Sequence, residues 1–152
     1  MSDYKARIGI IGKGFVGTAV AHGFSSQTGF GASIKVYDKD PVKSINSLNE
    51  TVNESDFIFL SVPTPSKKDG SIDLSILKDA IKSIDSINKS DNIILVRSTV
   101  VPGTTRDIQK EFPKLNIVFN PEFLTERSAA FDFINQTRVI LGGKEKYTSK
   151  VK

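Results

Sequence analysis

The fold is decided by residues 5–38, KARIGIIGKGFVGTAVAHGFSSQTGFGASIKVYD. Within them Gly12, Gly14 and Gly17 form the pattern G-x-G-x-x-G, which follows an apolar run and opens a segment of helix-forming character. A second apolar run ends at Asp38, about twenty residues beyond the glycines. A strand, a glycine-rich turn, a helix and a strand that ends in a carboxylate are the combination expected to bind a dinucleotide.

Each glycine of this turn has a physical reason. Gly12 allows the tight turn from strand to helix, and Gly17 lets the helix lie close to the sheet. Gly14 has no Cβ, so a pyrophosphate can approach the free amides at the helix N-terminus. The predicted cofactor-binding residues of the turn are the three glycines with Phe15 and Val16. The alternative is a glycine-rich turn that binds nothing.

Asp38 is predicted to bind the adenosine ribose of the cofactor. Its carboxylate would accept hydrogen bonds from the ribose hydroxyls, and its charge would repel the 2′-phosphate of NADP. Lys39, which follows it, carries the opposite charge. The predicted cofactor is NAD.

Length and composition indicate one globular domain. The chain has 152 residues, 38% of them hydrophobic and 25% charged, which is ordinary for a folded domain. We expect the domain to span residues 1–143, with residues 144–152 forming a polar tail or the start of a helix. The net charge of +4 comes from scattered lysines without interleaved aromatic residues, so no nucleic-acid partner is predicted.

Cysteine is absent and histidine occurs once, at His22. Disulfides and thiolate nucleophiles of this chain are thereby excluded, and no metal site is predicted. His22 falls inside the first helix, where packing or surface exposure is expected. No apolar run approaches the roughly twenty residues of a membrane span, and residues 1–5 are too polar for a signal peptide. The expected location is cytoplasmic, with no membrane partner.

The remaining chain alternates strands and helices. Strands are predicted at residues 5–11, 33–38, 57–62, 93–96, 116–119 and 138–141, and helices at residues 15–26, 41–48, 73–88 and 104–112. Residues 63–70, rich in proline and polar residues, are predicted to stay outside the sheet. The order predicts an α/β fold of the Rossmann type, with a doubly wound, mostly parallel sheet and helices on both faces.

Ligands of such sheets bind at the carboxyl ends of the strands. The residues at these ends, beyond the glycine turn and Asp38, are Val62, Pro63, Thr64, Arg97, Ser98, Thr99, Glu122 and Glu126. A carboxylate beside a hydride acceptor can act as a general base, and a threonine can orient a water molecule. Exposed loop charge is the alternative for both glutamates. Arg97 and Arg138 are expected either to contact phosphates or, more commonly, to form structural ion pairs.

Several motifs together carry a family resemblance. They are the glycine turn with Asp38, SVPTP at 61–65, RSTVVPGTT at 97–105, NPEFLTE at 120–126 and RVILGG at 138–143. Over nearly the whole chain these resemble the N-terminal NAD-binding domain of the nucleotide-sugar 6-dehydrogenases, the UDP-glucose and GDP-mannose dehydrogenase family.

The resemblance implies an oxidoreductase. Members of that family oxidise the C6 alcohol of a nucleotide sugar such as UDP-glucose to a carboxylate with NAD, through an aldehyde and a thioester to an enzyme cysteine. Matched by motif, Asp38 and Lys43 would contact the adenosine end, and Val62, Pro63, Thr64, Ser98 and Thr99 would lie along the cofactor. Thr99, Glu126 and the nearby Glu122 would act on the hydrolytic water, and Phe123, Leu124 and Glu126 would line the sugar site.

The departures from the family pattern are equally specific. The family's cysteine, catalytic lysine and substrate-positioning asparagine come from later domains, and this chain contains no cysteine. The span between Asp38 and Phe57 is shorter and lacks a strand and a helix, so one edge of the sheet should be altered. Arg127 stands where the family has glycine, which would crowd the sugar site. The proline that precedes the Arg138 strand in the family is also missing.

Three interpretations follow. The chain is a short or truncated dehydrogenase that needs further chain, a partner chain or a homo-oligomer to turn over. Alternatively, it is a stand-alone dinucleotide-binding module without catalysis. The third is another Rossmann oxidoreductase such as a β-hydroxyacid dehydrogenase, which would need a lysine from a later helical domain.

Overall fold

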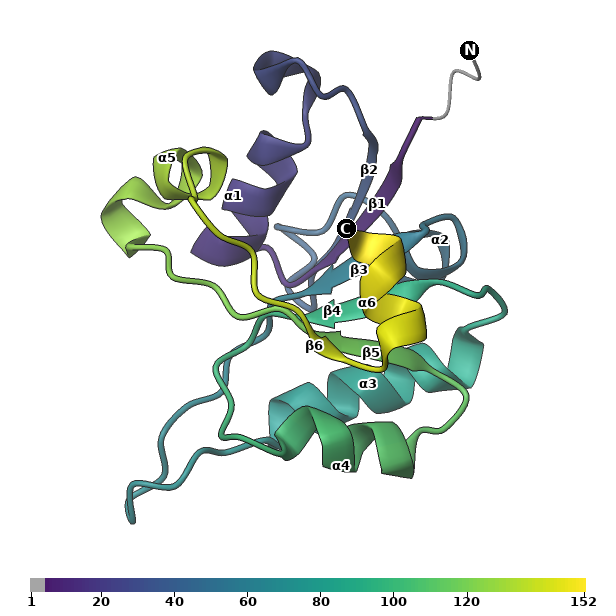
Figure 1. Cartoon of the computed structure of the whole chain (residues 1–152), viewed down its shortest axis with the longest axis vertical. Helices are drawn as coiled ribbons and strands as arrows, with labels where there is room; N and C mark the ends of the chain where they lie inside the picture. Colours follow the sequence, from purple (N-terminus) through teal and green to yellow (C-terminus); the bar gives the residue numbers. More distant parts are fainter. Residues whose placement is uncertain (1–4) are drawn as a thin grey trace.

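The computed structural model describes residues 5–152, so the polar residues 1–4 lie outside the described part. Its centre is a six-stranded sheet in the order β2-β1-β3-β4-β5-β6 (Figure 1). The strands are β1 (Arg7–Ile11), β2 (Ser33–Tyr37), β3 (Phe57–Leu60), β4 (Ile93–Val96), β5 (Asn116–Phe119) and β6 (Gly142–Gly143). β1 to β5 pair in parallel and β6 is antiparallel to β5. The predicted doubly wound, mostly parallel sheet is confirmed.

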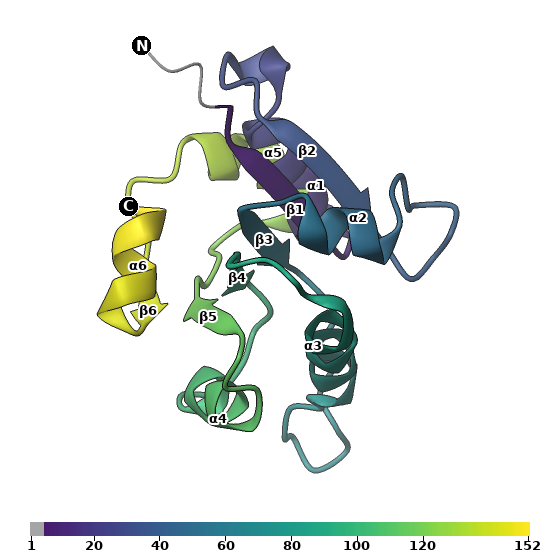
Figure 2. The ribbon, with the colours of Figure 1, turned by 90° about the vertical axis from the view of Figure 1, so that its right-hand side faces the viewer.

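Helices cover both faces of the sheet (Figure 2). The α-helices are α1 (Phe15–Gly23), α2 (Leu48–Asn53), α3 (Ser75–Ile87), α4 (Thr104–Glu111), α5 (Ala129–Ile134) and α6 (Glu145–Val151). Two 3₁₀ turns, η1 (Ser26–Thr28) and η2 (Glu126–Ser128), precede β2 and α5. The core between the sheet and α1, α5 and α6 includes Ile10, Val20 and Tyr147, and the core under α2, α3 and α4 includes Ile58, Ile81 and Ile108.

The central strands are apolar because both of their faces are covered. All four residues of β4 are buried, and alternate residues join opposite cores: Leu95 faces the α1 side and Ile94 the α3 side. Unbroken apolar runs are typical of parallel strands in this position. For the same reason the predicted strands 93–96 and 116–119 agree with β4 and β5 to the residue.

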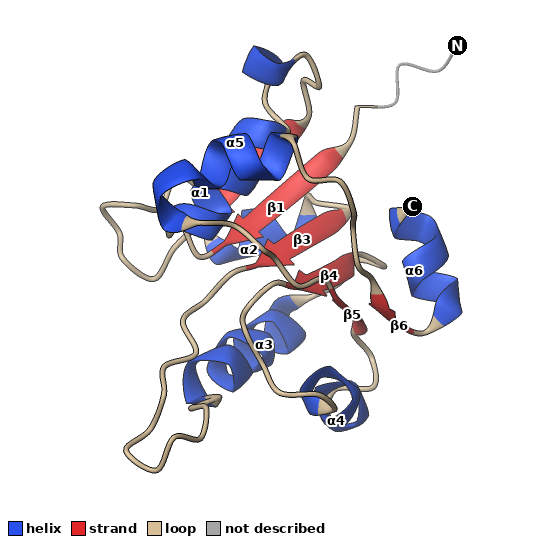
Figure 3. Ribbon diagram, turned by 60° about the vertical axis from the view of Figure 1, so that its left-hand side comes forward, coloured by secondary structure: helices blue, strands red, loops and turns tan. Residues whose placement is uncertain are grey.

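The topology places a switch point next to the glycine turn. From β1 the chain moves to β2 at one edge, then crosses back to β3 on the other side of β1. Neighbouring connections thus leave the carboxyl end of the sheet in opposite directions, and Figure 3 shows β1 and β3 pointing toward this same end. Among the described residues β2 is the edge strand, and α2 is the only helix between β2 and β3.

The helix predicted at residues 41–48 is wrong. The carboxylate of Asp40 accepts a hydrogen bond from the Val42 amide, and the amides of Ile45 and Asn46 bond to the Val36 carbonyl, so this segment follows the free edge of β2. The helix α2 begins only at Leu48. Its start is fixed by a capping box in which the side chains of Ser47 and Glu50 bond to each other's backbone amides.

The strand predicted at residues 138–141 is also wrong. Val139 and Ile140 are 60% and 42% exposed, and pairing with β5 begins at Gly142 instead. A Cβ on Gly143 would lie 3.1 Å from the Ile117 carbonyl, and its φ of 156° is one that other residues rarely adopt. The position of β6 in the sequence is therefore determined by the close approach of its glycine backbone to β5, and not by apolar side chains.

Two further boundaries differ from expectation. The first helix ends at Gly23 rather than at residue 26, and η1 follows it. The loop predicted to stay outside the sheet makes one isolated antiparallel bridge of its own, between Ser66 and Ile72. The predicted helix start at residue 73 is also early: α3 begins at Ser75 with Leu74 at the N-cap position, and the Asp73 carboxylate accepts the Ser75 amide at 2.9 Å. None of the helices within residues 5–152 is long and apolar enough to cross a membrane.

Candidate functional site

Gly12 and Gly17 are required by packing inside the glycine turn. Gly12 has a φ of 94°, and a Cβ there would lie 2.3 Å from the Ser61 carbonyl oxygen at the end of β3. A Cβ on Gly17 would lie 2.0 Å from the carbonyl oxygen of Gly12. Substitution at either position forces backbone atoms apart, so these two glycines close the β1–α1 turn tightly against the sheet.

Gly14 has no such structural reason. Its φ of −81° suits any residue, and a Cβ there would meet nothing within 4 Å. It precedes α1, whose N-terminus has no side-chain cap and no acidic residue in its first turn. Free amides and the positive end of the helix dipole therefore face open space, which is the arrangement that binds phosphate.

The Asp38 carboxylate points at this turn. One carboxylate oxygen accepts the Lys13 amide at 2.6 Å, and the other accepts the Asp40 amide at 2.8 Å. The Asp38 amide in turn donates to the Ser44 hydroxyl at 3.1 Å. Each carboxylate oxygen keeps further acceptor capacity, so the acid is oriented beside the turn and remains able to accept hydroxyl protons.

A cleft of about 960 Å³ runs along this edge of the sheet. From the predicted site it is lined by Gly12, Gly14, Phe15, Val16, Asp38, Lys43, Val62, Pro63, Thr64, Ser98, Thr99 and Glu122. The carboxyl ends of four strands contribute to it, as expected for a switch-point cleft. Of the predicted cofactor-binding residues only the buried Gly17 does not line the cleft.

Two hydroxyl side chains join neighbouring strand ends in the floor of the cleft. The Ser98 hydroxyl donates to the Val62 carbonyl at 2.7 Å and accepts the Val62 amide at 3.1 Å. The Thr64 hydroxyl donates to the Thr99 carbonyl at 2.7 Å. The segments after β3 and β4 are thereby held together, while Thr99 itself is exposed to the cleft.

Arg97 lies buried at the same end of the cleft and is 4% exposed. One of its terminal nitrogens donates to the Asn120 side-chain oxygen at 2.6 Å, whereas Nε and Nη2 have no partner among the described residues. Its guanidinium lies 5.5 Å from the Phe133 ring centroid. Burial lowers the pKa of Arg97 to about 10, and the charge of Glu122 opposes this shift. The expected structural ion pair is therefore replaced by an amide and aromatic rings.

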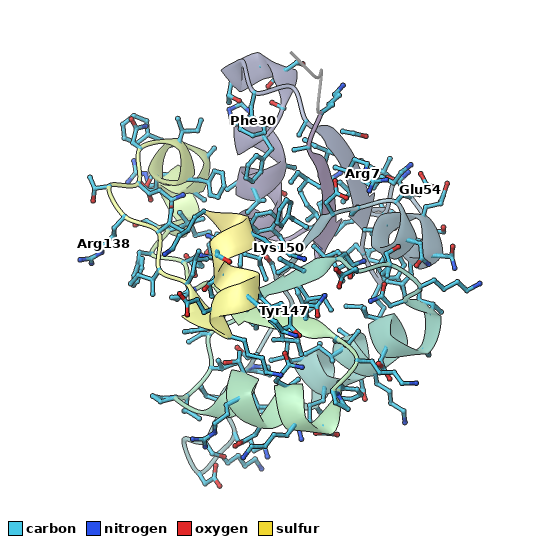
Figure 4. All side chains as sticks on the ribbon, turned by 45° about the vertical axis from the view of Figure 1, so that its right-hand side comes forward. Arg7, Phe30, Glu54, Arg138, Tyr147 and Lys150 are labelled. Atoms are coloured by element: carbon cyan, nitrogen blue, oxygen red, sulfur yellow. The ribbon has the colours of Figure 1, made fainter. Side chains whose placement is uncertain are left out.

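Arg138 also lacks an ion pair among residues 5–152, and it does not line the cofactor cleft. Its guanidinium lies 5.4 Å from the ring centroid of Phe123, and Figure 4 shows the side chain pointing away from the molecule. Among residues 5–152 no carboxylate lies within ion-pair distance of Arg138. A cation–π contact at the surface is the interaction the structure provides.

The structure separates the two glutamates that the motif brought together. Glu122 lines the main cleft, and one of its carboxylate oxygens accepts the Leu124 amide at 2.6 Å. Glu126 begins η2 and lines a shallower hollow of about 480 Å³, with Phe15 and Arg127. Phe123 is 60% exposed, Leu124 packs on the core, and neither lines the main cleft. Glu122 therefore faces the cofactor cleft, whereas the predicted sugar-site residues Phe123, Leu124 and Glu126 do not.

Sequence reasoning missed one wall of the cleft. Leu48 of α2 and a stripe on α3 line it, and the α3 residues are Ile76, Asp79, Ala80 and Ser83. The signal was present in the sequence as a second helical spacing, i, i+3, i+4 and i+7, beside the apolar one that predicted the helix.

The residues of the cleft fit a dinucleotide. Gly14 leaves room above free amides for the pyrophosphate, and Asp38 is oriented for a ribose, one strand away. The order of the sheet and the cleft at its switch point define a dinucleotide-binding α/β domain.

Comparison with known proteins gives the family. The model of the UDP-glucose/GDP-mannose dehydrogenase family, NAD binding domain, matches residues 35–152. The chain belongs to this family and contains its NAD-binding domain, which confirms the predicted family and cofactor.

Individual relatives support the same family assignment. The UDP-glucose 6-dehydrogenase AglM of Haloferax volcanii is 30% identical over 90% of this chain and 41% of its own length. A UDP-glucose dehydrogenase of Pyrobaculum islandicum has a TM-score of 0.83 at 27% identity, covering 99% of this chain and 44% of that one. A ternary complex of GDP-mannose dehydrogenase from Pseudomonas aeruginosa has a TM-score of 0.77 at 28% identity, covering 95% and 42%. The chain spans 18% to 41% of the first curated relatives that it matches.

Proposed function

We propose that this chain binds NAD in the switch-point cleft as the cofactor-binding part of a nucleotide-sugar 6-dehydrogenase. The observation that carries the proposal is the position of the Asp38 carboxylate, fixed on the Lys13 amide beside the open space at Gly14. A ribose on the carboxylate and a pyrophosphate on the turn would then be neighbours, as they are in a dinucleotide.

The position of Asp38 then assigns a part of the cofactor to each of the other cleft residues. The free amides after Gly14 bind the pyrophosphate, and Lys43 contributes a positive charge near the adenosine end. Val62, Pro63, Thr64, Ser98 and Thr99 lie along the remaining length of the cofactor. The charge of Asp38 disfavours a 2′-phosphate, so NAD binds in preference to NADP.

The proposed chemistry is oxidation at the C6 alcohol of a nucleotide sugar. NAD, when bound, supplies the hydride acceptor. Glu122 and Thr99 line the same cleft, so Glu122 accepts the proton and Thr99 positions the reacting oxygen. Glu126, with Phe123 and Leu124, would contact the sugar nucleotide from the adjoining loop. The named activities of the Haloferax and Pseudomonas relatives support this substrate class.

To complete that reaction, these residues would need a thiol from outside them, supplied by further chain or by a partner. It contains no cysteine, whereas the resemblance implies a thioester to an enzyme cysteine. The same observation favours a second candidate, a dinucleotide-binding module without catalysis. The two candidates share the NAD site and differ in whether a sugar nucleotide and a partner chain bind.

Calorimetry with NAD, NADP and UDP-glucose tests the proposal. We expect NAD to bind, NADP to bind at least about tenfold more weakly, and Asp38→Ala to lower NAD affinity about tenfold, since hydrogen bonds to a charged group contribute about 1.5–3 kcal/mol. Asp107→Ala on α4, which does not line the cleft, is the control. Unchanged NAD affinity in Asp38→Ala would show that the ribose assignment is wrong. NADH production from UDP-glucose at the rate of a complete enzyme would contradict the need for a thiol.

A further inference from the structure

The buried guanidinium of Arg97 has a single hydrogen-bond partner. Arg97 directly follows β4 and is 4% exposed, and its Nη1 donates to the Asn120 side-chain oxygen at 2.6 Å. Nε and Nη2 have no partner within residues 5–152. The ring centroids of Phe59 and Phe133 lie 5.9 and 5.5 Å from the guanidinium carbon. These contacts fix the orientation of the guanidinium, and Asn120 is the group that it can position through a hydrogen bond.

Asn120 connects this guanidinium to a second segment of the chain. Its side chain is buried, and its Nδ2 donates to the Ile140 carbonyl at 3.0 Å. The guanidinium can only donate and the carbonyl can only accept, so one orientation of the Asn120 amide pairs both of its ends. The Asn120 backbone amide also donates to the Val96 carbonyl at 2.9 Å. Asn120 thus joins the ends of β4 and β5 to the segment before β6.

The loop after β5 depends on Asn120 for its position. Residues 121–123 form no backbone hydrogen bond within residues 5–152, and Pro121 has no amide proton to donate. The next hydrogen bond along the chain is local, since the Glu122 carboxylate accepts the Leu124 amide at 2.6 Å. Glu122 lines the cofactor cleft only two residues beyond Asn120. A displacement of Asn120 would therefore also displace Glu122.

We propose that Arg97 is a positioning residue, which holds Asn120 and thereby fixes the position of Glu122 in the cleft. We refer to the hydrogen bonds from Arg97 to Asn120 and from Asn120 to Ile140 as the clamp. A general base must lie about 2.6–3.2 Å from the proton donor, and a loop without backbone hydrogen bonds does not hold that distance by itself. The proton-accepting role of Glu122 rests on the proposed function, whereas the clamp is measured without a cofactor.

Hydrogen exchange of the Leu124 amide in the ligand-free chain tests the clamp, because this amide donates to the Glu122 carboxylate. Arg97→Met and Asn120→Leu should each exchange at least about tenfold faster, as one lost hydrogen bond to a charged group predicts. Arg97→Lys keeps a charged donor and should stay within about threefold of the wild type. The double variant Arg97→Met with Asn120→Leu should exchange no faster than the faster single variant, because both changes break the same clamp.

Asn92→Leu is the matched control, because Asn92 is also buried but precedes β4 at the opposite end of the sheet, where its Nδ2 donates to the Val52 carbonyl at 2.7 Å. It should leave Leu124 exchange unchanged. Unchanged Leu124 exchange in Arg97→Met, no recovery in Arg97→Lys, or equal acceleration of the core Leu95 amide would overturn the proposal. An intact clamp in a chain that binds no NAD would overturn the proposed function alone.

Discussion

At the scale of single residues, Gly12 and Gly14 have different reasons to be glycine. Alanine at Gly12 would hold a positive φ, at a cost of about 1–3 kcal/mol, and place its Cβ 2.3 Å from the Ser61 carbonyl. Alanine at Gly14 meets no atom, so we expect the free energy of unfolding to change by less than about 1 kcal/mol. Gly14→Ala should nevertheless lose NAD affinity, because the methyl group enters the space above the amides.

Urea unfolding and calorimetry measure the two effects separately. The combination expected for Gly14→Ala is near-native stability with at least about tenfold weaker NAD binding, the loss that about 1.4 kcal/mol represents. Gly12→Ala should unfold at clearly lower urea. If Gly14→Ala bound NAD as tightly as the wild type, the phosphate would not lie on this turn.

Arg97 is the second residue with an unusual energy balance. Burial lowers the pKa of Arg97 from its usual value to about 10, so the unfolded chain binds the proton more tightly than the folded chain does. The charge therefore costs stability below pH 10, on the order of 3 kcal/mol, and the cost declines as the pH rises above 10. Replacing Arg97 removes this cost but leaves the Asn120 acceptor unpaired, which costs about 1–3 kcal/mol.

The two effects nearly cancel, so Arg97→Met should unfold within about 1 kcal/mol of the wild type at neutral pH. The control is Leu95→Ala in the same strand region, which should lose about 2–5 kcal/mol as a buried truncation. Urea midpoints of the three proteins make the comparison. A loss in Arg97→Met as large as that in Leu95→Ala would show that the guanidinium is mainly a structural element. Near-native stability of Arg97→Met would mean that the buried charge of Arg97 serves the cleft that it lines and not the stability of the fold.

At the scale of elements, α2 depends on its cap. It has only 6 residues, too few to be stable alone, and its capping box joins Ser47 and Glu50. Hydrogen bonds from the Ser47 hydroxyl and amide lower the pKa of Glu50. A carboxyl whose folded pKa is lowered adds stability above its unfolded value of 4.5, and that stability is lost as the pH falls through the folded value.

Ser47→Ala should therefore cost about 1 kcal/mol at pH 7, and the difference from the wild type should shrink below pH 4.5 as Glu50 becomes protonated. The measurement is the urea midpoint of both proteins at several pH values. Ser86→Ala, at the exposed end of α3, is the control, since within residues 5–152 its hydroxyl bonds only to the Ser83 carbonyl. A difference that grew on acidification would contradict the capping role.

The sequence predicted well those elements whose own residue pattern determines their structure, without help from tertiary contacts. β4 and β5 are apolar runs buried on both faces, and the site residues at their ends follow from strand order alone. α5 and β6 escaped prediction because tertiary contacts form them. Phe133 of α5 packs where a Cβ on Gly23 would lie 2.2 Å from its ring, and β6 consists of glycines paired with β5. The cleft-lining residues of α3 were missed because their mixed apolar and polar spacing indicates a ligand-binding wall only once the fold places them in the same cleft as Asp38.

At the scale of the whole molecule, the predicted sugar-contacting residues lie outside the cofactor cleft. The cleft is formed by strand ends and helices of this chain alone, whereas Phe123 and Glu126 lie outside it on the loop before α5. A ligand that binds only the folded chain stabilises it by an amount that grows with the logarithm of the ligand concentration relative to its Kd. NAD should therefore stabilise this chain by itself, and UDP-glucose should not.

The size of the effect follows from linkage. At a concentration of about 100 times its Kd, NAD should add about 2.7 kcal/mol, which for a chain of this length raises Tm by roughly 5–10 °C. ADP-ribose should give a similar shift because it reaches the same turn and carboxylate, and Asp38→Ala should reduce both shifts at the same concentrations. UDP-glucose should leave Tm unchanged because the residues proposed to contact the sugar lie outside the cofactor cleft. A UDP-glucose shift as large as that of NAD would mean that these residues already form a complete sugar-nucleotide site, with no further chain or partner needed for sugar-nucleotide binding.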